Sequence, residues 1–207
     1  MQTITPAHAV RDTNRKTTRL WFADDSPVPT GEYDIRGGIC WPIPTPDGGI
    51  KGFAVVIGRH LSTNVYHWLD ETEWICVDHV MEDGRVAFEG IAPWLNDVWR
   101  RFHLGQWYYH GDRELAFRYR TQIKKSEQIQ PKPKMTEALW DRDEYAIAIL
   151  REIKEGNRFA VPRDSITFQT EVVWSAAAPG SDMPGPMLAL CSVLASMELY
   201  KWDGHRR

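Results

Sequence analysis

The stretch Lys51–His60, KGFAVVIGRH, is a short and nearly continuous apolar run. A short continuous apolar run of this kind is typical of a buried strand. Strand-like segments follow at close spacing over residues 64–70, 73–80 and 85–89, with a turn at residues 82–84 before the last of them. We therefore predict an antiparallel meander around the run at residues 51–60.

The chain that precedes this run divides into two parts. Residues 1–18 are polar, carry Arg11, Arg15 and Lys16, and contain no apolar core of the kind that a signal peptide needs. We interpret them as a polar N-terminal arm whose composition is compatible with disorder. From Arg19 onward the chain becomes strand-like and rich in turn residues.

Three segments carry the signals of helices. Residues 92–104 have Pro93 in their first turn, an apolar stripe at spacings of three and four, and a glycine just beyond their end. Thr136 precedes the second segment, residues 137–155, as a candidate N-cap. The third helix is expected over residues 187–202. Its methionines and small side chains make it a candidate surface for a partner or for a second copy in a homo-oligomer.

Residues 107–124 are predicted to form a β-hairpin that turns at Gly111-Asp112. The second arm of this hairpin alternates in polarity, which is the period of a strand. One face of the arm would be apolar or aromatic and would consist of Leu115, Phe117, Tyr119, Thr121 and Ile123. The other face would be mostly basic and would include Arg118, Arg120 and Lys124.

Together these segments predict an α+β protein with a mainly antiparallel sheet and about three helices, arranged as a single compact domain or as two small subdomains. The polar stretch 126–135 contains two prolines and is the best candidate for an internal linker. It would join a β-rich subdomain with one helix, residues 19–125, to a helix–strand–helix part at residues 136–207. The strand of that last part is expected over residues 165–174.

Composition limits the class of protein. The cysteines Cys40, Cys76 and Cys191 lie far apart and form neither a disulfide framework nor a zinc pattern, which is typical of reduced thiols in the cytoplasm. The longest apolar run near the end of the chain, Met187–Met197, has about 11 residues and is too short to span a bilayer. We therefore expect a cytoplasmic protein with no membrane partner.

The positive charge of the chain is concentrated between Arg100 and Lys134. The chain of 207 residues has a formal net charge of −3, whereas this segment holds nine Lys/Arg against three acidic residues, a local charge of +6. Cations bind phosphates and flat aromatic faces stack on bases. The pattern favours a non-enzymatic binding protein that engages a polyanion, with nucleic acid as the leading candidate. The predicted binding residues are Arg100, Arg101, Trp107, Tyr108, Tyr109, Arg118, Arg120, Lys124 and Lys125.

The first alternative is a protein–protein adaptor or inhibitor. Arginine, tryptophan and tyrosine are the residue types that dominate the energetics of protein interfaces. The same basic and aromatic surface, or the last helix, would therefore also suit an acidic surface on a partner protein. Steep salt dependence together with sequence-tolerant binding would favour nucleic acid over a protein partner.

The second alternative is an enzyme whose site is assembled from scattered cysteine, histidine and acidic residues. Cys76, Asp78 and His79, with His60 and His67 upstream, are the strongest candidates for such a site. Neighbouring strand residues such as Asp78 and His79 point to opposite faces, however, and no ligand spacing matches a zinc pattern. We therefore predict no metal and no cofactor, assign no catalytic residue, and favour a non-enzymatic protein.

Overall fold

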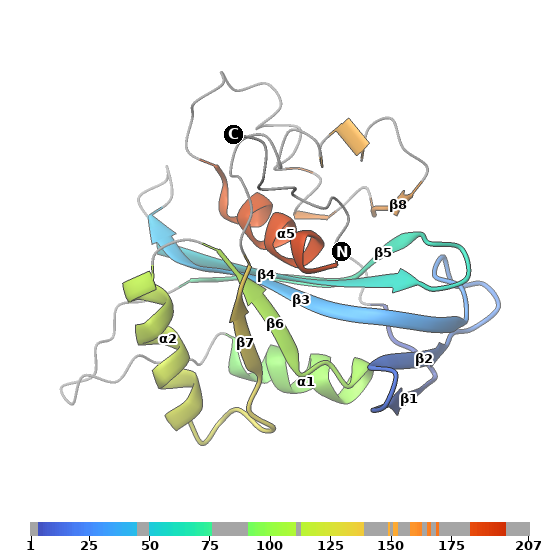
Figure 1. Cartoon of the computed structure of the whole chain (residues 1–207), viewed down its shortest axis with the longest axis horizontal. Coiled ribbons are helices and arrows are strands. Elements are labelled where there is room, and N and C mark those ends of the chain that lie inside the picture. The colour runs from blue at the N-terminus through green and yellow to red at the C-terminus, as the bar shows by residue number, and fades with distance from the viewer. Residues whose placement is uncertain are drawn as a thin grey trace.

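The computed structural model describes residues 4–44, 50–75, 91–110, 113–138, 149, 151–152, 158–162, 165–166, 169 and 183–197. These residues form an α+β domain in which a mostly antiparallel, eight-stranded sheet lies between two layers of helices (Figure 1). The predicted fold class, with its compact single-domain form, is confirmed.

The sheet is built around the apolar run at residues 51–60. The strands are β1 (His8–Asp12), β2 (Thr17–Trp21), β3 (Gly31–Pro44), β4 (Ile50–His60), β5 (Tyr66–Ile75), β6 (Gln106–Tyr109), β7 (Lys134–Glu137) and β8 (Phe159–Ala160). Their order is β1-β2-β3-β4-β5-β8, and β6 pairs with both β3 and β7. Consecutive strands from β1 to β5 pair antiparallel, whereas β6 pairs in parallel with β3 and β7, and β8 pairs in parallel with β5.

The central position of β4 agrees with the predicted meander. β4 pairs with β3 on one side and with β5 on the other. The segments expected over residues 64–70 and 73–80 are one continuous strand as far as Ile75, with a register shift opposite Val56/Ile57. The rest of the expected meander, residues 76–89, lies outside the described residues.

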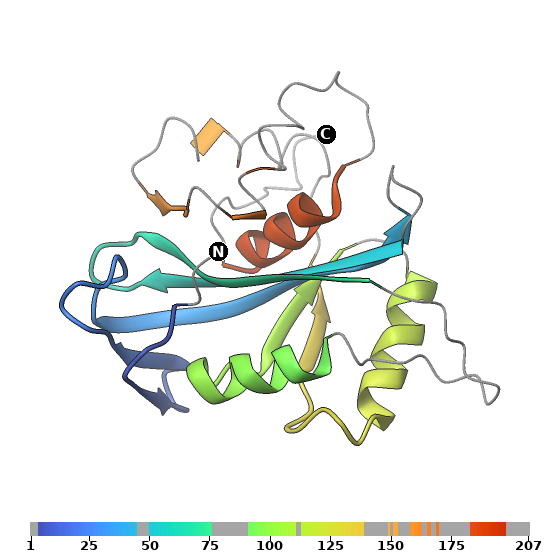
Figure 2. The same cartoon turned by 180° about the vertical axis from the view of Figure 1, so that it is seen from behind.

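The two faces of the sheet carry separate apolar cores. Ala54 and Val56 of β4 belong to a core shared with α1 (Ala92–Phe102) and α2 (Arg113–Lys125). Phe53, Val55 and Ile57 point the opposite way into a core shared with α5 (Gly185–Ser196). Figure 2 shows the same arrangement from behind, with α5 on one side of the sheet and α1 and α2 on the other. A strand that is covered on both faces needs apolar residues at every position, which explains the continuous run in β4.

Helix α1 follows its sequence signals. It has a proline in its first turn, and its buried stripe includes Leu95, Val98 and Phe102. The helix ends at Phe102, two residues before the predicted end, because His103 adopts a left-handed conformation as its C-cap. Arg100 and Arg101 lie in the last turn, where the helix dipole favours cations.

Helix α5 is apolar on all sides and is buried over Gly185–Leu194. It lies very close to the sheet: a Cβ atom on Gly38 of β3 would stand 2.0 Å from the carbonyl oxygen of Ala189. A glycine at this point of the strand therefore allows the helix backbone to approach. The side chains of α5 are already covered within one chain, and a homo-oligomer through this helix stays a prediction. Residues 198–202 of the expected helix lie outside the described residues.

The predicted strand at residues 113–124 is wrong, because the segment is helix α2. Its buried residues are Ala116, Tyr119 and Ile123, at the three- and four-residue spacing of a helix. The alternation of Phe117, Tyr119 and Thr121 suggested a strand. The segment is nevertheless rich in Arg, Glu, Leu, Ala, Gln and Lys, which are good helix formers.

The described part of the N-terminal arm contains a strand from its eighth residue onward. Residues 8–18, predicted as part of a polar arm compatible with disorder, form β1 and the start of β2. The turn between them is held by the Asp12 carboxylate, which accepts hydrogen bonds from the backbone N–H groups of Asn14 and Arg15 at 2.9 and 3.0 Å. A hairpin at the edge of a sheet is solvated on much of its surface, so a polar composition does not prevent it from forming.

Other corrections concern the second half of the chain. Thr136 lies inside β7 and does not cap a helix, and Ile166 and Gln169 are helical where a strand was expected. The helix expected over residues 137–155 lies mostly outside the described residues.

The stretch 126–135, the predicted linker, is held against α1, since the Asn96 side chain donates to the Gln128 carbonyl and accepts from the Gln130 N–H. The proposed division into subdomains at this stretch stays a prediction.

Within the described ranges, no helix combines the length and the apolar character needed to cross a membrane.

Candidate functional site

Helix α2 is held to the sheet by an aromatic contact on its inner side. The ring of Tyr119 stacks on the ring of Trp41 from β3, with centroids 5.5 Å apart and planes at 4°. Ala116 and Ile123 are buried on the same side of the helix. Residues three and four positions apart share one face of a helix, so these three residues define the inner face of α2.

The outer side of α2 is strongly basic. The surface of α2 outside this contact carries five cations, Arg113, Arg118, Arg120, Lys124 and Lys125, which we call the α2 basic face; Arg120 is half-buried at its edge, and the other four are exposed. Glu114 is the one acidic residue of the helix. Figures 1 and 2 show α2 at one end of the helix layer that it forms with α1. Concentrated charge of one sign creates a local potential that differs from the potential expected of the net charge.

The cations of this face differ in how firmly they are held. The Arg120 guanidinium donates to the Tyr109 hydroxyl at 2.9 Å and lies 5.7 Å from the centre of the Tyr109 ring. Arg113 pairs with Glu137 at 3.6 Å but remains highly exposed. Within the described part of the chain, Arg118, Lys124 and Lys125 are exposed and make no side-chain hydrogen bond or ion pair. These three cations are therefore open to an anionic ligand.

The two arginines predicted on α1 lie in different environments. Arg100 is exposed and pairs loosely with Asp97 at 3.5 Å. Arg101 has a side chain that is only 10% exposed, pairs with Asp70 of β5 and with Asp97, and donates to the Ile4 carbonyl. Arg101 therefore joins α1 to the sheet and to the N-terminal segment, and it does not belong to an open binding surface.

The aromatic residues predicted to stack on bases are not together on the surface. Trp107 and Tyr109 of β6 are 1% and 3% exposed and belong to the core beneath α1 and α2. Tyr108 points to the opposite face, where the Arg36 guanidinium lies 5.7 Å from its ring centre. Alternate residues of a strand point to opposite sides, so β6 could not present all three rings to one ligand.

Phe117 is the residue that sequence reasoning missed. The predicted strand placed it on the buried face with Tyr119, whereas in α2 its side chain is 72% exposed. Arg113, four residues before it, was also left out of the predicted site. Helical spacing would have identified Phe117, because a helix that buries Ala116 and Tyr119 turns Phe117 toward solvent. Arg113 lies four residues before Phe117 and therefore on the same side of the helix.

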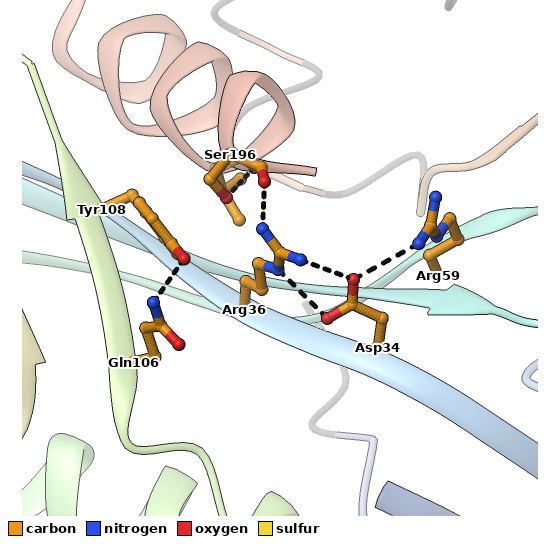
Figure 3. Close-up of polar contacts among 7 residues, drawn as sticks. Asp34, Arg36, Arg59, Gln106, Tyr108 and Ser196 are labelled. Carbon is orange, nitrogen blue, oxygen red and sulfur yellow. Dashed lines mark hydrogen bonds and ion pairs between the residues drawn. The ribbon is translucent and has the colours of Figure 1, made fainter. Parts of the chain in front are cut away.

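A second charged cluster lies on the opposite face of the sheet (Figure 3). The Asp34 carboxylate accepts two hydrogen bonds from the Arg36 guanidinium, at 3.1 and 3.0 Å, and one from Arg59 at 3.4 Å. Arg36 also donates to the Ser196 carbonyl at the C-terminal end of α5. A cation at this end of a helix binds free carbonyl groups and complements the helix dipole. The cluster therefore anchors α5 on β3.

The described histidines and cysteines lie apart from one another or in structural contacts. Among the described residues, no group of three or more His, Cys, Asp or Glu side chains is placed to hold a metal ion. His60 bonds to Thr63 in the β4–β5 turn. His67 is buried with both ring nitrogens unbonded, and burial lowers its pKa to about 4. Cys76, Asp78 and His79 lie outside the described residues.

A surface hollow of about 420 Å³ lies over the β1–β2 hairpin and the start of β3. Its lining mixes Arg11 and Arg19 with Asp12 and Glu32. Trp21 also lines it, with the Arg19 guanidinium 5.4 Å from its ring centre. The opposite charges compensate one another, so this hollow does not have the single sign of charge that a polyanion requires.

Comparison of the chain with protein-family models, with curated proteins and with solved structures finds no significant match to any of them.

Proposed function

We propose that this chain is a non-enzymatic binding protein that engages nucleic acid through the α2 basic face. The observation that carries the proposal is the arrangement of α2, where five cations and one acid lie on a helix whose inner side is fastened to the sheet. A helix that is already folded and packed presents its cations without further ordering of the backbone, which limits the entropy lost on binding.

The ligand class follows from charge. Phosphate contacts supply most of the affinity of sequence-independent nucleic-acid binding, and they require cations that are free of internal ion pairs. Arg118, Lys124 and Lys125 meet this condition among the described residues. The net charge of −3 does not oppose the proposal, because the potential close to α2 depends mainly on the charges nearest to it.

The test is the binding of fluorescently labelled oligonucleotides, measured by anisotropy at about 50 and 200 mM salt. The variant is Arg118→Glu with Lys124→Glu, since neither side chain supports the core and glutamate is a good helix former. We expect affinity to fall by about tenfold or more and the salt dependence to become shallower. Arg120 is kept, because its contact with Tyr109 belongs to the packing of α2.

The matched control is Arg15→Glu with Arg19→Glu in the β1–β2 hairpin. This control changes the net charge by the same amount as the test variant, but at exposed positions outside α2. We expect this control to bind nearly as the wild-type chain does. Absence of binding at the lower salt concentration, or an equal loss in both double variants, would contradict the proposal.

A further inference from the structure

We propose that Phe117 is a base-stacking residue and that the ligand of the α2 basic face is single-stranded nucleic acid. This inference rests on the proposed function. It adds that the ligand is single-stranded, and it names the residue that distinguishes a single strand from a duplex. The structural basis is an aromatic ring that projects from the helix between cations.

The exposure of Phe117 is not required by the fold. Its side chain is 72% exposed, compared with 48% for Val10 and 41% for Leu61, the other large apolar side chains on the described surface. Ala116, Tyr119 and Ile123 of α2 are buried in the core, and Leu115 packs against it. Phe117 belongs to neither group. An aromatic side chain that is left in water on a helix whose core is complete is available to a ligand.

The neighbours of Phe117 on the helix surface are cations. Arg113 precedes it by four residues and Lys124 follows it by seven, which places these two exposed cations on the same side of α2. Arg120, three residues after Phe117, is half-buried and bonds to Tyr109. The helix has 13 residues and is about 20 Å long. A ring with cations before and after it along this length matches a nucleotide chain, which alternates stacking faces with phosphates.

The position of the ring favours a single strand over a duplex. In a duplex the faces of the bases are covered by their neighbours, and a side chain reaches them only by separating a base step. An unpaired base exposes a face and can stack on a ring that projects from the protein surface. Trp107 and Tyr109 are in the core, so Phe117 is the aromatic ring that the described part of α2 and β6 presents on this side.

A membrane surface fits the same helix less well. A helix that lies on a bilayer buries a continuous apolar stripe in the lipid, with its cations on the other side. The apolar stripe of α2 is instead packed on Trp41 and the rest of the core. Only Phe117 would remain to enter the lipid, and one ring does not form such a stripe. Stacking on a base, by contrast, requires only one ring.

The test compares two ligands with the same number of phosphates, a labelled 20-nucleotide dT strand and a labelled 20-unit abasic strand. We expect the wild-type chain to bind the dT strand about five- to hundredfold more tightly, the range of one stacked base. Phe117→Ala should lose this preference by weakening the dT complex while leaving the abasic complex unchanged. Phe117→Leu should behave like the alanine variant, and Phe117→Trp should retain the preference.

Leu61→Ala removes another exposed apolar side chain, in the β4–β5 turn, and should change neither complex. The inference is wrong if the wild-type chain binds both strands equally, if Phe117→Ala weakens both by the same factor, or if a 20-residue polyglutamate or a 20-base-pair duplex binds as tightly as the dT strand. These outcomes differ from failure of the proposed function, in which no oligonucleotide binds or the Arg118/Lys124 reversal has no effect.

Discussion

The ring of Trp41 in β3 and the ring of Tyr119 in α2 are stacked almost parallel, with their centroids 5.5 Å apart. This contact joins the longest described strand to the helix that carries the basic face. Both side chains are buried, and Tyr109 also packs against Trp41. The orientation of the basic face therefore depends on a contact between residues that are distant in the sequence.

We expect Tyr119→Ala to destabilise the chain by about 3–5 kcal/mol, the usual range for removing a buried aromatic ring. Tyr119→Phe keeps the ring on Trp41 and should cost clearly less. Urea unfolding followed by tryptophan fluorescence measures both variants. Equal destabilisation by the two substitutions would show that the ring stacking is not what holds α2.

The ion pair between Arg101 and Asp70 should be far more important for stability than the pair between Arg100 and Asp97. The side chains of Arg101 and Asp70 are only 10% and 8% exposed, so removing one leaves the other charge buried. We expect Arg101→Met to destabilise the chain by about 3–5 kcal/mol. Arg100→Met should cost about 0–1 kcal/mol, because that pair is exposed. Chemical unfolding of the two variants provides the comparison, and similar losses would contradict it.

The stability of the chain should depend on the protonation of His67. Burial, together with a smaller effect of His60, lowers the pKa of His67 from 6.5 to about 4 in the folded state. Between these two values the unfolded chain binds the proton more readily than the folded chain. Stability contributed by neutral His67 is therefore present above pH 6.5 and is lost as the pH falls toward 4, by up to about 1.4 kcal/mol per pH unit.

The measurement is the free energy of unfolding at pH 7.0, 6.0 and 5.0 for the wild-type chain and for His67→Leu. The difference between the two proteins cancels the titration of other groups. We expect the wild-type chain to lose stability relative to the variant as the pH decreases. A difference that is constant over this range would exclude a buried neutral His67.

Two glycines should respond in opposite ways to alanine. A Cβ atom at Gly38 would meet the backbone of α5 at 2.0 Å, so we expect Gly38→Ala to displace the helix and to destabilise the chain by about 1–3 kcal/mol. Gly105, between α1 and β6, has open space around its Cβ position. Gly105→Ala should be neutral or stabilise by up to about 1 kcal/mol. Thermal unfolding of both variants measures the contrast, and a neutral Gly38→Ala would mean that α5 is not packed this closely.

Part of the candidate site was predictable from the sequence. The concentration of cations in residues 100–134 is a property of composition, and Arg118, Arg120, Lys124 and Lys125 do lie together on α2. The aromatic half of the prediction depended on which way Trp107 and Tyr109 point. That direction is set by the pairing of β6 with β3 and β7, and no pattern within residues 106–109 contains this information.

The apolar pattern of residues 113–125 did not by itself decide between a strand and a helix. Leu115, Phe117, Tyr119 and Ile123 fit an alternating strand, whereas Ala116, Tyr119 and Ile123 fit a helix. Both readings bury Tyr119, so the apolar pattern does not separate them. The strong helix formers in the segment favoured the helix, and the contact with Trp41 fixed the face that is buried.

The sequence by itself determined the central strand β4, helix α1 and the separation of charge along the chain. Each of these follows from residues close together in the sequence: a continuous apolar run, a proline followed by an apolar stripe, and a cluster of cations. Only the tertiary structure decided that α2 is fastened by Trp41, that Arg101 is buried against Asp70, and that Phe117 is left exposed. The physical reason is that burial is decided by the partners a segment meets, and these partners come from distant parts of the chain.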